Sequence, residues 1–85
     1  MFVRVVHRQG WDVERVAPGR DVEKRTLATR EAALEFARGL SPDWIEVGEV
    51  VPATGAVEQH HEWTTLRRQP DGSYAPSGLR WGGKG

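Results

Sequence analysis

Hydrophobic and polar residues alternate in three short segments near the start of the chain. This is the pattern of β-strands, whose successive side chains point to opposite faces of a sheet. The segments are 2–8, 11–16 and 22–27, and the first two are joined by Gln9-Gly10. Such a short connection with a glycine predicts a hairpin. The third segment is so rich in charge that it suits the edge of a sheet or a solvent-facing side.

A single segment, residues 28–40, has the spacing of an amphipathic helix. Its apolar stripe consists of Ala33, Phe36, Ala37 and Leu40. Thr29 is a good N-cap, because its hydroxyl can accept a hydrogen bond from a free amide of the first turn. Gly39 is the expected left-handed residue at the end of the helix, and Pro42 prevents its continuation.

The second half of the chain returns to strand patterns. Residues 44–51 and 56–68 are predicted strands, residues 73–76 suit a short further strand, and the Gly-rich end suits irregular structure. The predicted class is α+β: an antiparallel sheet of four to six strands with one helix on one face. The expected order is three strands, a helix and two strands, with a further strand at the end. Residues 1–68 are expected to form one α+β domain, and residues 69–85 a C-terminal hairpin or tail extension that is partly irregular.

The predicted sheet has more apolar surface than one helix covers. Apolar side chains occur on both faces of the first and fourth strands, and the chain contains 4 Trp. Such a surplus is typical of an interface between copies of a chain. The candidate interface residues are Phe2, Val6, Trp44, Val50 and Trp63. A homo-oligomer is therefore expected, and a dimer is favoured.

Composition narrows the possible functions. The chain has 85 residues, enough for one small domain, and 0 Cys, so it has no disulfide or thiolate chemistry. The opening residues lack the apolar core of a secretory signal, and no apolar run approaches the length of a membrane span. A cytoplasmic protein without a membrane partner is expected.

The net charge of +0 hides an uneven distribution. Residues 41–66 carry five acidic and no basic side chains, whereas residues 67–85 carry four basic side chains and one acidic. The basic end suggests an alternative, nucleic-acid binding through the sheet and segment 67–84, since cations contact phosphates and rings stack on bases. The residues concerned are Arg67, Arg68, Arg80, Trp81 and Lys84. A nucleic-acid binder more often has a clear basic excess, so this alternative is not favoured.

The segment "VEQHHEW", residues 57–63, suggests a metal site at first sight. Strand alternation places His60 and His61 on opposite faces, so the two rings cannot share one ion. A single face would instead carry Glu58, His60 and Glu62, spaced about 6.8 Å apart, which is wide for one ion. A solvated strand face is the preferred interpretation. A metal-dependent enzyme centred on these three residues is the weaker hypothesis, and no cofactor is expected.

Four local features together carry a resemblance to a known family. They are the Gly10-Trp11 hairpin, Thr29 followed by "REA", a further alanine at Ala33 or Ala37, and the turn at Gly55. Over about residues 3–60 the chain resembles a family of very small bacterial proteins that is catalogued as a domain of unknown function. The chain continues beyond about residue 60, where typical members stop. The resemblance implies the topology and supplies no activity.

No recognised catalytic signature occurs in the sequence. The leading hypothesis is therefore a small non-enzymatic interaction domain that associates with itself through the apolar face of its sheet.

Overall fold

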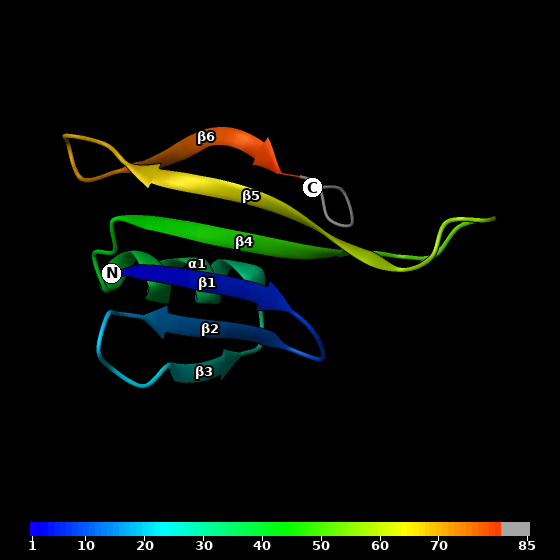
Figure 1. The fold of residues 1–85 in the computed structure, drawn as a ribbon, viewed down its shortest axis with the longest axis horizontal. Helices are drawn as coiled ribbons and strands as arrows, with labels where there is room; N and C mark the ends of the chain where they lie inside the picture. Colours follow the sequence, from blue (N-terminus) through cyan, green and yellow to red (C-terminus); the bar gives the residue numbers. More distant parts are fainter. Residues whose placement is uncertain (81–85) are drawn as a thin grey trace.

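The computed structural model describes residues 1–80, and of residues 78–80 it describes the backbone. Six strands form one sheet in the order β3-β2-β1-β4-β5-β6, and a single helix packs against one face of it (Figure 1). The elements are β1 (Phe2–His7), β2 (Trp11–Val16), β3 (Glu23–Leu27), α1 (Arg30–Gly39), β4 (Trp44–Val51), β5 (His60–Arg68) and β6 (Tyr74–Arg80). The α+β class with one helix is as predicted.

The sheet is mixed, so the prediction of a purely antiparallel sheet is wrong. β1 and β4 pair in parallel, from Val3 opposite Ile45 to Val6 opposite Gly48, and the other neighbouring strands pair antiparallel. The physical reason is the helical connection. It carries the chain from β3, at one edge, across β2 and β1, so that β4 runs in the direction of β3 and β1.

The helix begins where the sequence predicts. The Thr29 hydroxyl accepts a hydrogen bond from the Ala32 amide at 3.1 Å, which satisfies one free donor of the first turn. Ala33 and Ala37 are buried as expected. Leu34 is buried as well, although it lies outside the predicted stripe, and Phe36 is only partly buried.

The helix ends later than predicted. Gly39 still belongs to α1, and the left-handed residue is Ser41, with φ 53°. The amides of Leu40 and Ser41 bond to carbonyls of the last helical turn. Because a residue before proline is disfavoured in the right-handed helical region, the backbone reverses at Ser41, next to the fully buried Pro42.

The core lies between α1 and the three central strands. It consists of Val3, Val5, Val13, Ala33, Leu34, Ala37, Ile45 and Val47. The strand members alternate with residues that point away from the helix. That alternation leaves the opposite side of the sheet without a covering element among residues 1–80.

Between β4 and β5 the chain projects beyond the sheet as an arm, residues 52–59 (Figure 1). The arm is a narrow hairpin in which Thr54 and Val57 exchange backbone hydrogen bonds of 2.9 and 2.8 Å, and Gly55 has φ 54°. The predicted strand 56–68 is therefore too long. It begins at His60, because residues 56–59 have left the sheet.

β6 closes the sheet beside β5 and is longer than the predicted segment 73–76. The Tyr74 hydroxyl donates to the Pro42 carbonyl at 2.5 Å, and its ring packs against the core. The first half of the expected C-terminal extension is thus part of the sheet. The Gly-rich end expected to be irregular, residues 77–85, begins instead inside β6, which continues to Arg80, and its residues 81–85 lie outside the described residues.

Candidate functional site

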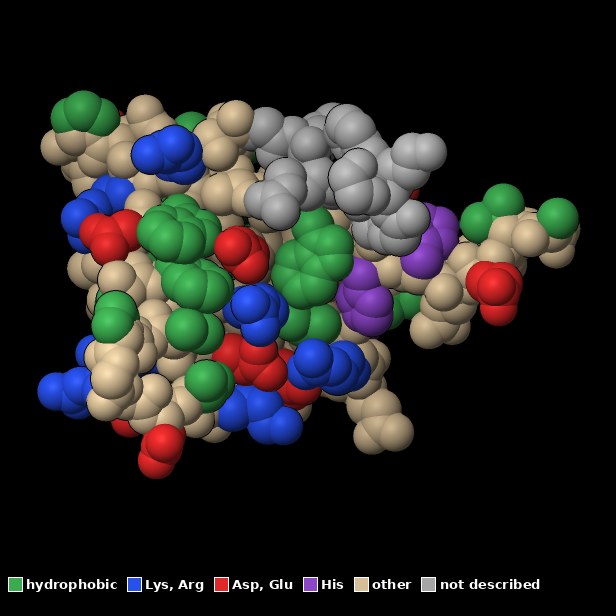
Figure 2. Space-filling model, in the orientation of Figure 1, with side chains coloured by type: hydrophobic (Ala, Val, Ile, Leu, Met, Phe, Trp, Pro, Cys, Tyr) green, Lys and Arg blue, Asp and Glu red, His purple; other side chains and the backbone are tan. Residues whose placement is uncertain are grey.

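The side of the sheet opposite α1, here named the open face, gathers the residues that the sequence predicted for an interface. The strand registers place these side chains on it: Phe2, Arg4, Val6, Asp12, Glu14, Val16, Lys24, Thr26, Trp44, Glu46, Val50, His61, Trp63, Thr65 and Arg67. All five predicted interface residues, Phe2, Val6, Trp44, Val50 and Trp63, are among them. Figure 2 shows this face, with hydrophobic side chains interspersed with charged ones.

One aromatic cluster joins the start of β1 to the start of β4. The rings of Phe2 and Trp44 stack with their centroids 4.8 Å apart and their planes inclined by 6°. The Trp44 indole donates a hydrogen bond to Glu46 at 3.1 Å, which fixes the orientation of the ring. Both rings remain partly exposed, so a flat aromatic surface faces outward.

A second aromatic residue, Trp63, covers the middle of β4. Its ring lies against Gly48, so close that a Cβ on Gly48 would be 2.8 Å from a ring carbon. Gly48 pairs on its other side with Val6, which is only 2% exposed. Sequence reasoning did not single out Gly48. The available signal was a glycine inside a strand pattern, which often marks a close approach.

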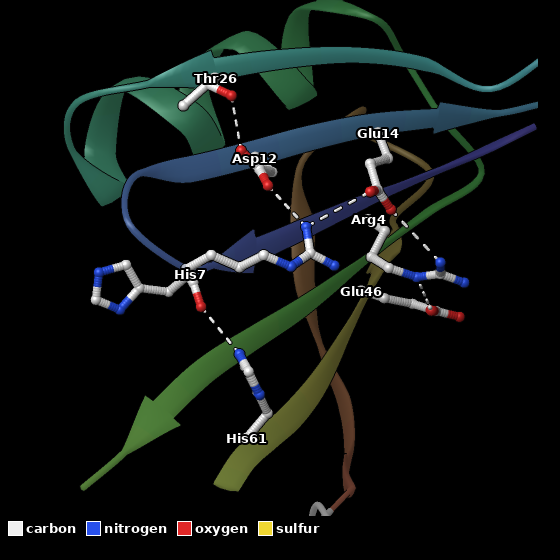
Figure 3. Close-up of polar contacts among 8 residues, drawn as sticks. Arg4, His7, Asp12, Glu14, Thr26, Glu46 and His61 are labelled. Carbon is white, nitrogen blue, oxygen red and sulfur yellow. Dashed lines mark hydrogen bonds and ion pairs between the residues drawn. The ribbon is translucent and has the colours of Figure 1, made fainter. Parts of the chain in front are cut away.

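Charged side chains on the open face are paired with one another across strands (Figure 3). Arg4 on β1 lies between Glu14 and Glu46, with N–O distances of 3.5 and 3.6 Å. Arg4 also lies over the Phe2 ring, 5.7 Å from its centroid. Each of these charges has an opposite charge beside it, since Glu14 also pairs with Arg8, and this lowers the cost of covering the face with another surface.

The most buried carboxylate, Asp12, anchors one end of this network. It accepts hydrogen bonds of 2.7 Å from both the Thr26 hydroxyl and the Arg8 guanidinium, and it is 8% exposed. The hydrogen bond from Thr26, followed by that from Arg8, lowers the pKa of Asp12. The same contact raises the pKa of Arg8. These bonds hold the turn between β1 and β2 against β3.

The three histidines make separate contacts in the structure. His61, on the open face, donates from Nε2 to the His7 carbonyl at 2.9 Å (Figure 3), whereas His60 lies on the helix side and contacts the Glu58 carbonyl. The His7 ring stacks on Trp11 with a centroid separation of 4.3 Å. Within residues 1–80, no three His, Asp or Glu side chains are arranged to hold a metal ion. The candidate set Glu58, His60 and Glu62 lies within these residues.

The residues of the nucleic-acid hypothesis are not brought together in the described part of the chain. Arg67 lies on the open face opposite Trp44. Arg68 points the other way, where it donates to the Ser41 carbonyl at 2.9 Å and to Asp43 at 3.1 Å. Arg80 belongs to β6, but its side chain is outside the description, as are Trp81 and Lys84.

Comparison with protein-family models, curated proteins and solved structures finds no match to this chain. The resemblance to the family of very small bacterial proteins therefore stays a prediction. The only helix among the described residues is too short to cross a membrane.

Proposed function

We propose that this chain is a small non-enzymatic interaction domain that forms a homodimer through the open face of its sheet. The observation that carries the proposal is the position of the stacked Phe2–Trp44 pair and of Trp63 on the face that α1 does not cover. Aromatic side chains supply a large contact area at low entropic cost, and they are enriched in the centres of interfaces.

The paired charges of the open face support the same function. Arg4 already has two carboxylate partners. A second protein surface can therefore cover it without burying an unpaired charge. A two-fold axis would place the same patch on both subunits, in an isologous contact. In such a contact the Phe2–Trp44 pair of one subunit meets either the same pair or Trp63 of the other subunit.

Nucleic-acid binding is less well supported. On the open face Arg4 and Arg8 are already paired with Asp12, Glu14 and Glu46, so a phosphate would have to compete with these carboxylates for them. Arg68 is already engaged with Asp43 on the helix side of the sheet. The contacts of the described arginines thus favour protein association.

The test compares two neighbouring valines on opposite faces of β4. Val50 lies on the open face and Val51 on the helix side, and both are partly exposed. Sedimentation equilibrium at low concentration should show a monomer–dimer step for the wild-type chain and for Val51→Arg, and Val50→Arg should abolish that step. Circular dichroism and urea unfolding would show whether both variants keep the fold. A wild-type chain that stays monomeric up to high micromolar concentration would refute the proposal.

A further inference from the structure

A groove runs between the edge strand β3 and the helix, on the side of the sheet away from the open face. It has a volume of about 470 Å³, and its lining includes Arg25, Leu27, Ala32, Glu35, Phe36 and Leu40. β3 is the last strand of the sheet, so one of its backbone edges borders the groove without a neighbouring strand in the described chain. An apolar groove at the edge of a sheet can accept an apolar segment of another protein chain.

The lining of the groove contains one cation, Arg25, and one carboxylate, Glu35. The Arg25 guanidinium lies over the Phe36 ring, 4.9 Å from its centroid. Within residues 1–80, no carboxylate lies within ion-pair distance of Arg25, while the neighbouring Glu23 is paired with Arg15. A segment that fits the groove should therefore combine an apolar side chain with an adjacent carboxylate.

The arm of this chain has that combination. Residues 50–57 contain no charged side chain, and Glu58 follows them. All residues of the arm are exposed, and Val57 exposes 52% of its surface, among the highest values for a large hydrophobic residue of the described chain. Nevertheless the arm is an ordered hairpin, held by the backbone bonds between Thr54 and Val57.

We propose that the arm of one copy of this chain docks in the groove of another copy. Val57 packs against Phe36 and Leu40, and the carboxylate of Glu58 pairs with Arg25. The arm cannot reach the groove of its own subunit, because it projects from the ends of β4 and β5 while β1 and β2 separate β4 from β3 (Figure 1).

This contact differs in kind from the open-face dimer. The arm and the groove are different surfaces, so the contact is heterologous and each copy can bind one neighbour on each side. Repetition of the arm–groove contact links the copies into open chains or closed rings, whereas association through the open face ends at a dimer. None of the residues of the arm contact lies on the open face, so the proposal is independent of the proposed function.

The test is sedimentation velocity on the full chain at increasing concentration. The wild-type chain should form species larger than a dimer. Val57→Glu should lower the association constant for these larger species about tenfold or more, as expected for the loss of a central apolar contact. Val22→Glu is the matched control, because Val22 is similarly exposed, at 56%, but does not line the groove. It should leave the growth unchanged.

A charge exchange tests the pairing itself. Arg25→Glu and Glu58→Arg should each weaken the growth, and the double variant should restore it. Wild-type species no larger than a dimer, or a Val57→Glu variant that behaves like the wild type, would overturn the arm contact. Loss of the dimer in Val50→Arg reports on the open face alone, so the two proposals fail separately.

Discussion

Trp63 and Gly48 form a matched pair across β5 and β4. The indole ring occupies the space where any other residue at position 48 would place its Cβ, and three ring carbons would lie 2.8 to 2.9 Å from that atom. Real Cβ atoms do not approach so closely. The flat position of the Trp63 ring on the open face therefore depends on a residue without a side chain.

Gly48→Ala is expected to destabilise the protein and to lift the Trp63 ring. Overpacking of this kind costs about 1–3 kcal/mol. Urea unfolding gives the free energy, and Trp fluorescence reports on the ring. Gly39→Ala is the control, because an added Cβ there meets nothing within 4 Å. In the last turn of α1, alanine should be neutral or should stabilise by up to about 1 kcal/mol. Equal unfolding energies for the two variants would contradict the pairing.

The faces of the strands were predictable from the sequence because strand alternation is a local property. It placed Phe2, Trp44 and Trp63 on one side and separated His60 from His61, and the registers agree. Which strands are neighbours is not local. The parallel pairing of β1 with β4 follows from the path of α1 over two strands. The alternation of polar and apolar residues carries no information about that path.

The contacts between residues distant in the sequence could not be predicted either, because they depend on which strands are neighbours. The approach of Trp63 to Gly48 and the pairing of Arg4 with Glu46 exist only once the strand registers are set. Arg68 was a candidate for phosphate binding because of its charge alone. Its engagement with Ser41 and Asp43 depends on how the turn after α1 meets β5.

The stability of the protein should fall in acid partly because of Asp12. Its folded-state pKa lies below the ordinary value of 3.8, owing first to the Thr26 hydroxyl and then to Arg8. The contribution of the charged group is therefore complete above that value and is lost as the pH falls through the folded-state pKa. Urea unfolding between neutral pH and pH ~3 should show this loss.

Asp12→Asn should remove most of that contribution at neutral pH. The change costs about 1–3 kcal/mol, because a charged acceptor of two hydrogen bonds is lost in a largely buried position. The variant's free energy of unfolding should also depend less on pH in acid. Asp21→Asn, at an exposed position, is the control and should behave like the wild type. An unchanged acid dependence in Asp12→Asn would show that other carboxylates dominate.

The hydrogen bond from Tyr74 to Pro42 should anchor β6 to the turn after α1. Tyr74→Phe keeps the ring against the core but leaves the Pro42 carbonyl without this donor, so we expect a loss of about 0.5–1.5 kcal/mol. Hydrogen exchange should show faster opening of β6 than of β1 in the variant. The comparison with β1 separates a local effect from global destabilisation, which would raise exchange in both strands.

Binding to nucleic acid should be absent or weak if the open face is a protein interface. Fluorescence titration with single-stranded and double-stranded DNA and RNA is expected to show no binding whose affinity falls steeply with salt, the signature of released counterions. If such binding occurs, Arg67→Gln should reduce it and its salt dependence, because Arg67 lies on the open face beside the aromatic pair. Arg68→Gln is the control and should leave this binding unchanged, because the Arg68 guanidinium is bound to Asp43 on the helix side of the sheet. A strong, salt-dependent affinity that Arg67→Gln abolishes would make the open face a nucleic-acid surface instead of a dimer interface.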